Sequence, residues 1–161
     1  MNAANEMPRR GPPPLESFGL VLHRDASWTH EGVPILNRKL RARFDRAVRY
    51  LPEEGKYVVQ IGAFRGQIEI EEAGFFVRSV DFARGEIRLS DRSCEALDPA
   101  SLRASADGDA LLCTVKRDLL PEGLPALFSH AAQAELLLAI EEQGDQLVLA
   151  LAGVSHRLPP L

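Results

Sequence analysis

The chain has 161 residues, of which 45% are hydrophobic and 26% charged, and its formal net charge is −4. These values are typical of a soluble globular protein and exclude a disordered chain, and no apolar run approaches the roughly 20 residues that a membrane-spanning helix needs. The N-terminal segment lacks the apolar stretch of a secretory signal, and two cysteines are too few for a disulfide framework. We therefore expect a cytoplasmic protein with reduced cysteines and no membrane contact.

Basic residues are concentrated in one segment of an otherwise acidic chain. Residues 38–49 contain six basic residues and one acid, Asp45, whereas the isoelectric point of the whole sequence is about 5.6. Proteins that bind nucleic acid neutralise phosphates over a broad basic surface, which this composition does not provide. We therefore expect no nucleic-acid partner, and we expect the basic segment to bind an anionic small molecule or an acidic protein segment.

The N-terminal part begins without periodicity and then predicts two short strands. Residues 1–14 are rich in proline and arginine and predict a loose tail. An apolar run predicts a strand over 18–22, the sequence Asp25-Ala26-Ser27 predicts a turn, and residues 28–31 then form a second short predicted strand. A Gly-x-Pro sequence at 32–34 ends the second strand, because neither glycine nor proline continues a ladder well.

The basic segment predicts an amphipathic helix. Asn37 is a suitable N-cap because its side chain can accept hydrogen bonds from the first free amides, and Pro52 predicts the end of the helix. Arginine and lysine side chains fill most of the surface. Apolar residues recur at spacings of three and four, which places on one face Leu40, Phe44, Ala47, Val48 and Leu51.

The rest of the chain predicts more strands and one further helix. Period-two alternation, β-branched runs and glycine-containing turns predict strands over 57–61, 67–71, 75–80, 86–89, 101–104, 110–115, 147–151 and 154–158. Asp107-Gly108 is the strongest hairpin signal among them. We expect the second helix to begin at about residue 126 or 129 and to continue to Gln143, with Gly144 as its stop signal.

The predicted elements follow a similar order in two parts of the chain. A hairpin, a helix and paired strands are expected over 15–74, and hairpins, a helix and strands over 75–161. We therefore predict an α+β fold of two similar halves, each a helix packed against antiparallel β-strands.

The second predicted helix carries apolar residues on more than one side. One stripe contains Leu127, Ala131, Ala134 and Leu138, while Leu136 and Ile140 lie nearly opposite. A helix of this kind is usually buried on more than one side, either by a curved sheet or by a partner molecule. Both a monomer and a homodimer fit this pattern.

The opening hairpin and several later segments carry a set of motifs that spans about residues 18–158. They are Asp25-x-x-Trp28-x-x-x-Gly32-x-Pro34-Ile35, Arg43-Phe44, Ile68-Glu69-Ile70-Glu71-Glu72-Ala73-Gly74-Phe75, Val115-Lys116-Arg117-Asp118, Ala126-Leu127-Phe128 and Glu135-Leu136. Together these motifs resemble a proteobacterial family known as a domain of unknown function. The resemblance implies an α+β fold of two parts with repeated motifs, and it suggests a role in signal transduction.

The sequence departs from that family's pattern at three places. Ala26 stands where the family prefers glycine, and Gly74 stands where it prefers proline. Residues 60–63, Gln-Ile-Gly-Ala, replace a segment that is usually Thr-Pro-Val-Glu. A ligand that depends on that glutamate would not be shared by this protein.

The histidines near the opening hairpin raise the hypothesis of a metal-dependent enzyme. His23 and Asp25 would face the same side of a continuous strand, and with His30 across the hairpin they could supply two imidazoles and a carboxylate to a metal. The alternative is a group of polar residues around an exposed turn. We favour the alternative and predict no metal site, because the spacing matches no established metal motif.

The basic helix is the better candidate for binding. Arg38, Arg41 and Arg49 lie along one side at helical spacing, and guanidinium groups bind carboxylates and phosphates bidentately. Trp28 could stack on a ligand, although a single tryptophan is more often a core anchor. The alternative for the helix is a solvated face that pairs with acids of the same half. The predicted ligand-binding residues are Trp28, Arg38, Arg41 and Arg49.

No catalytic motif accompanies these residues. Ser129 and His130 are adjacent, so on a helix they point apart and cannot form a nucleophile–base pair by themselves. The sequence contains no Gly-x-Ser-x-Gly elbow, phosphate loop or dinucleotide fingerprint. We therefore expect a non-catalytic binding or signalling accessory protein without a cofactor, and we assign no catalytic residue.

Overall fold

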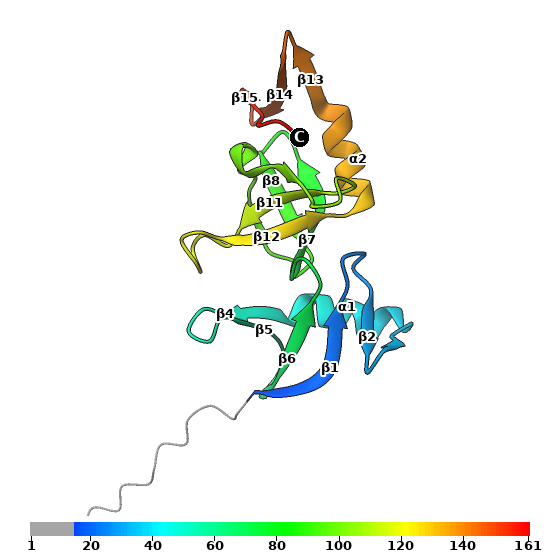
Figure 1. Ribbon diagram of the computed structural model, residues 1–161. Coiled ribbons are helices and arrows are strands. Elements are labelled where there is room, and N and C mark those ends of the chain that lie inside the picture. The colour runs from blue at the N-terminus through cyan, green and yellow to red at the C-terminus, as the bar shows by residue number, and fades with distance from the viewer. Residues whose placement is uncertain (1–14) are drawn as a thin grey trace, which may run out of the picture.

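Figure 1 shows the computed structural model, which describes residues 15–161. The predicted loose tail over 1–14 lies outside the described residues. Two short α-helices and one 3₁₀ turn, Pro99–Ser101, accompany three β-sheets within this range, so the predicted α+β class is confirmed. The first sheet occupies the lower part of Figure 1, and the later elements occupy the upper part.

The first six-stranded sheet is built by residues up to Ile70. Its strands are β1 (Glu16–Leu22), β2 (Trp28–His30), β3 (Val33–Pro34), β4 (Val48–Leu51), β5 (Lys56–Ile61) and β6 (Phe64–Ile70), in the spatial order β3-β2-β1-β6-β5-β4. Helix α1 (Arg38–Ala47) follows β3 in the chain and contacts β5.

The remaining residues form a second six-stranded sheet and a three-stranded sheet. The second sheet contains β7 (Phe75–Asp81), β8 (Glu86–Leu89), β9 (Cys94–Ala96), β10 (Arg103–Ala104), β11 (Leu111–Val115) and β12 (Leu124–Phe128), in the order β10-β11-β12-β7-β8-β9. Helix α2 (His130–Ala139) contacts β7 and β12. The three-stranded sheet contains β13 (Ile140–Gln143), β14 (Gln146–Leu151) and β15 (Val154–Arg157).

Each six-stranded sheet contains one parallel pair at its centre. β1 pairs with β6 in parallel, and β12 pairs with β7 in parallel, whereas the other strand pairs are antiparallel. The expectation of purely antiparallel strands in each half is therefore corrected. The physical reason is the length of the connection between the paired strands. A long connection, such as that from β1 through α1 to β6, allows the chain to return and run in the same direction.

The two central strands follow each other in the chain. β6 ends at Ile70 and β7 begins at Phe75, so residues 71–74 lead from the centre of one sheet to the centre of the next. A Cβ atom on Gly74 would lie 2.3 Å from the Tyr57 ring, which packs against Phe75 with ring centroids 6.1 Å apart. Glycine at this position therefore permits the two halves to approach closely.

Helix α1 is shorter than its sequence predicts. Its N-cap is Asn37, as predicted, and the Asn37 side chain accepts from the Leu40 amide at 3.0 Å. The helix ends at Ala47, however, and β4 begins at Val48 without a loop. The prediction of a helix to Leu51 was wrong because Tyr50 gains a cross-strand contact with Tyr57 instead, with ring centroids 4.9 Å apart.

Helix α2 buries one side and exposes the other. Ala132 and Leu136 are buried, but Leu138 is 88% exposed, and Ile140 belongs to β13. The predicted helix to Gln143 is therefore corrected to one that ends at Ala139, and within this chain only one of its sides is buried. As in α1, the helix passes directly into a strand at a β-branched residue, which favours extended backbone.

One apolar core runs through both halves. It extends from Leu20 on β1 to Leu151 on β14, and its largest fully buried side chains include Trp28, Phe75 and Phe76. Burial of one such side chain stabilises the fold by about 1.5–3 kcal/mol. No helix between residues 15 and 161 is both long enough and apolar enough to cross a membrane.

Two turns share one hydrogen-bond pattern, and we call them the Asp-x-Ser turns. The first, Asp25-Ala26-Ser27, joins β1 to β2, which confirms the predicted turn, and the second, Asp91-Arg92-Ser93, joins β8 to β9. In the first turn, Asp25 Oδ1 accepts from the Ser27 amide at 2.9 Å and from Ser27 Oγ at 2.6 Å. In the second turn, Asp91 Oδ1 accepts from the Ser93 amide at 3.0 Å and from Ser93 Oγ at 2.6 Å. The middle residue has a positive φ in both, 67° at Ala26 and 71° at Arg92.

Substitution of Ala26 by glycine is expected to stabilise the protein. A left-handed backbone costs a residue with a Cβ atom about 1–2 kcal/mol, and the extra entropy that glycine brings to the unfolded chain offsets part of this gain. We expect the free energy of unfolding to rise by about 0.5–1 kcal/mol in urea denaturation. Ala42→Gly, in the exposed part of α1, is the control and should lower it by about 1 kcal/mol; an equal loss in both variants would contradict the prediction.

Candidate functional site

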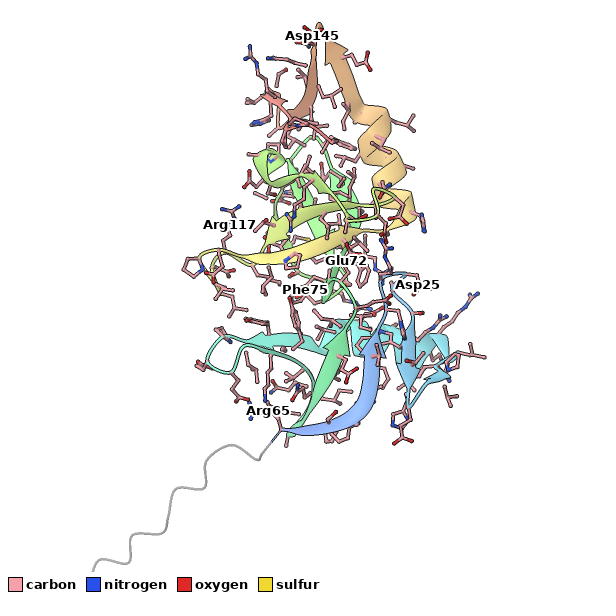
Figure 2. All side chains as sticks on the ribbon, in the orientation of Figure 1. Asp25, Arg65, Glu72, Phe75, Arg117 and Asp145 are labelled. Atoms are coloured by element: carbon pink, nitrogen blue, oxygen red, sulfur yellow. The ribbon has the colours of Figure 1, made fainter. Side chains whose placement is uncertain are left out.

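Arg24, next to the first Asp-x-Ser turn, links this turn to the second half through ion pairs. Its guanidinium lies 3.2 Å from the Glu72 carboxylate and also bonds the carboxylates of Asp107 and Asp109, the latter at 2.9 Å. Figure 2 shows Asp25 and Glu72 at the level where the two halves meet. The turn is therefore held at the junction of the halves by ion pairs to residues distant in sequence.

A depression of about 460 Å³ opens beside this turn, and we call it the arginine depression. It is lined by Asp25, Ala26, Ser27, Arg38, Arg41, Ala42, Asp45 and Arg78. A neighbouring depression of about 440 Å³ shares Asp25, Ala26 and Arg78 and reaches the N-terminus of α2 at Ser129 and His130. Volumes of this size suit small-molecule ligands.

Two of the predicted ligand-binding residues lie together in the arginine depression. Arg38 and Arg41 project from α1 at a spacing of three, which places them side by side on the helix. Neither forms an ion pair or a side-chain hydrogen bond with any residue in the part of the chain that the structure describes. Their guanidinium groups are therefore available to an anion.

Arg78, on β7, brings a third guanidinium from the other half. Its Nη2 donates to Asp45 Oδ2 at 3.1 Å, and its guanidinium lies 5.9 Å from the centre of the Phe76 ring. Sequence reasoning missed Arg78, because only the tertiary fold brings this residue of β7 near Asp45 of α1. No local pattern around Arg78 indicates this contact.

Trp28 supports the depression from within the core. Its side chain is 1% exposed and packs on Phe44 with ring centroids 5.4 Å apart. The Trp28 indole Nε1 donates to Asp45 Oδ1 at 2.8 Å. A buried ring presents no face to a ligand, so the predicted stacking role is replaced by that of a core anchor which orients Asp45.

Arg49 lies apart from Arg38 and Arg41. It belongs to β4, because α1 ends before it, and its Nη1 donates to the carbonyl oxygens of Arg46 and Val48, both at 2.8 Å. With Arg43 it lines a different, smaller depression of about 270 Å³. The predicted set of ligand-binding residues is therefore divided by the early end of the helix.

The histidines and Asp25 do not assemble the hypothetical metal site. His23 uses both ring nitrogens, with Nδ1 3.0 Å from Glu71 Oε2 and Nε2 2.9 Å from Thr29 Oγ1. His30 lies on the exposed edge of an apolar depression instead. Among residues 15–161, no group of three His, Cys, Asp or Glu side chains is placed to hold a metal ion.

The second Asp-x-Ser turn holds an ammonium group. The Lys116 Nζ donates to Asp91 Oδ2 at 2.7 Å and to Ser93 Oγ at 2.8 Å. The two charged side chains are only 9% and 16% exposed, for Asp91 and Lys116 respectively. Lys116 Nζ also lies 5.1 Å from the centre of the Phe75 ring, which places this ion pair against the core.

Hydrogen bonds lower the pKa of Asp91 in this turn more than burial raises it. Burial raises the pKa of the Asp91 carboxyl, but hydrogen bonds from Lys116 and Ser93 lower it further, and the pKa lies below its ordinary value. The pKa of Asp25, in the first turn, is also lowered, chiefly by the hydrogen bonds from Ser27. Both aspartates are therefore anionic at neutral pH.

The fold is similar to that of two solved structures. One is a DUF1285 family protein from Silicibacter pomeroyi DSS-3, with a TM-score of 0.64 and 18% identity over 92% of this chain and 83% of that one. The other is a DUF1285 family protein from Shewanella baltica OS155, with a TM-score of 0.50 and 14% identity over 74% of this chain and 91% of that one. No protein-family model and no curated protein matches the sequence. These likenesses support an α+β fold of the kind found in that domain-of-unknown-function family.

Substitution of Lys116 by methionine is expected to destabilise the protein by about 3 kcal/mol, because it leaves a buried carboxylate unpaired. The native pair stabilises the protein above the pKa of Asp91 in the unfolded chain, ordinarily 3.8, and this contribution is lost as the pH falls through the lower folded pKa. The variant should therefore lose less stability than the native protein between pH 5 and pH 3 in urea denaturation.

Arg117→Met is the matched control for this prediction. Arg117 forms an exposed ion pair with Asp98 at 3.0 Å, and such pairs contribute about 0–1 kcal/mol. Equal effects of the two substitutions would show that the Lys116 pair contributes no more than a surface ion pair.

Proposed function

We propose that this protein is a non-catalytic binding protein that captures an anionic small molecule in the arginine depression. The observation that carries the proposal is the convergence of three guanidinium groups, of which only that of Arg78 is paired within the described chain. Guanidinium groups are suited to carboxylates and phosphates because they donate parallel hydrogen bonds to two oxygens.

The position of the depression favours a small ligand. Its walls come from three parts of the chain, namely α1, the first Asp-x-Ser turn and Arg78 of β7. A compact anion can contact all three walls, whereas an extended acidic segment would leave most of its length outside a depression of about 460 Å³. The overall acidity of the chain disfavours nucleic acid as the ligand.

We also propose a signalling role, which the same position supports. Arg38 and Arg41 belong to the first half and Arg78 to the second, so an anion that contacts both sides stabilises one relative placement of the halves. A ligand shifts an equilibrium between two placements by its difference in affinity for them. The junction would thereby convert ligand binding into a change that a partner protein can recognise.

Thermal denaturation with a panel of anions tests the proposal. The panel contains inorganic phosphate, sulfate, mono- and dicarboxylates and nucleotides at constant ionic strength. A ligand at about 100 times its Kd stabilises the folded state by about 2.7 kcal/mol, which raises the Tm of a domain of this size by several degrees. The double substitution Arg38→Ala with Arg41→Ala should abolish that rise.

Arg43→Ala is the matched control, since Arg43 is an exposed arginine of the same helix outside the depression. It should leave the rise in Tm unchanged. If neither an anion of the panel nor an amino carboxylate raises the Tm, or if the double variant keeps the rise, the proposal fails. Stabilisation by a glutamate-rich peptide alone would identify an acidic protein segment as the occupant instead.

A further inference from the structure

The two Asp-x-Ser turns match in their backbone as well as in their side chains. In the first, the Ala26 amide donates to the His23 carbonyl and the His23 amide to the Ser27 carbonyl, each at 2.9 Å. In the second, the Arg92 amide donates to the Leu89 carbonyl and the Leu89 amide to the Ser93 carbonyl, again at 2.9 Å. Equivalent positions therefore carry equivalent atoms, and the contacts of one turn indicate what the other can bind.

In the second turn, two acceptors bind a primary ammonium. Asp91 Oδ1 is used within the turn, which leaves Asp91 Oδ2 and Ser93 Oγ to accept from Lys116 Nζ at 2.7 and 2.8 Å. The serine hydroxyl donates its own hydrogen to Oδ1 at 2.6 Å, so its lone pairs are presented to the ammonium. The turn is thus a small, preformed ammonium site that the chain fills with its own lysine.

The first turn presents the same two acceptors without a lysine. Asp25 Oδ1 is used by Ser27, and the 2.6 Å bond from Ser27 Oγ places that hydroxyl as in the second turn. Asp25 Oδ2 has no hydrogen-bond partner among the residues from 15 to 161. Both Asp25 and Ser27 line the arginine depression, which is the site of the proposed ligand.

The acids of the depression differ in what they can still accept. Asp45 uses both carboxylate oxygens, one for Trp28 and one for Arg78. Asp25 keeps one oxygen unused, and its carboxylate would repel a purely anionic ligand bound beside it. A ligand that also carries a cationic hydrogen-bond donor would instead be attracted by the Asp25 carboxylate.

We propose that the ligand of the arginine depression is an amino carboxylate or another molecule with both a primary ammonium and an anionic group. The ammonium donates to Asp25 Oδ2 and Ser27 Oγ, as Lys116 does in the second turn, and the anionic group is bound by Arg38, Arg41 and Arg78. This inference rests on the proposed function, because it names the class of ligand that the same depression selects.

Isothermal titration calorimetry with matched pairs of ligands tests the inference. The probes are the common amino acids and ω-amino carboxylates from glycine to 5-aminopentanoate, each compared with the carboxylate of the same length that lacks the amine. At least one amine-containing probe should bind about tenfold or more tightly than its partner, since a hydrogen bond to a charged group contributes about that factor. Its N-trimethyl derivative, which keeps the charge but has no N–H donor, should lose the advantage.

Asp25→Asn is the matched variant of the protein. Asparagine Oδ1 can still accept from Ser27 and preserve the turn, whereas its amide nitrogen replaces the acceptor that we assign to the ammonium. The variant should bind the amine-containing probe and its amine-free partner equally, and Arg43→Ala should keep the discrimination of the native protein.

The possible results separate this inference from the proposed function. If carboxylates bind equally with and without the amine, the inference is overturned while anion binding stands. The inference is likewise overturned if the N-trimethyl derivative binds as tightly as the primary amine. If neither member of any pair binds, the inference is overturned, and the proposed function is overturned as well only if no anion of the thermal-denaturation panel raises the Tm. Because the comparison of ligands uses the native protein, it does not depend on the folding of a variant.

Discussion

The carboxylate of Asp45 is the contact on which the arrangement at the junction depends. One of its oxygens accepts from the buried indole of Trp28 and the other from the guanidinium of Arg78, so a single side chain of α1 links the core of the first half to β7. A hydrogen bond to a charged group is worth more than a neutral one, and more again where water is partly excluded. Asp45 therefore fixes both the rotation of α1 and the position of Arg78.

Local patterns predicted those elements that depend on neighbours in the chain. The turn at 25–27, the cap at Asn37 and the hairpin at Asp107-Gly108 all rest on side chains that bond or shape their own backbone. The helix ends could not be predicted in the same way. α1 ends at Ala47 because Tyr50 contacts Tyr57 on the neighbouring strand. The spacing of apolar residues along the helix cannot predict a contact between two strands.

The candidate site was predicted in part for the same reason. Arg38 and Arg41 share a helix face, which their spacing indicates, and the structure places both in one depression. Arg78 of the depression belongs to β7 in the other half. Arg49 lies outside the depression, because it belongs to β4, the strand that replaces the last predicted turn of the helix. The burial of Trp28 follows from tertiary packing, although its size made a place in the core the more common outcome.

The direct connection from α1 to β4 determines the direction in which Arg38 and Arg41 project from the helix. With no loop between Ala47 and Val48, the sheet acts together with the contacts of Asp45 to constrain the orientation of the helix about its own axis. Each residue of an α-helix adds about 100° of rotation. Insertion or deletion of a single residue within α1 would therefore turn Arg38 and Arg41 away from the depression by about a quarter of a circle. The length of the helix between its cap and the sheet thus determines the direction of its charges.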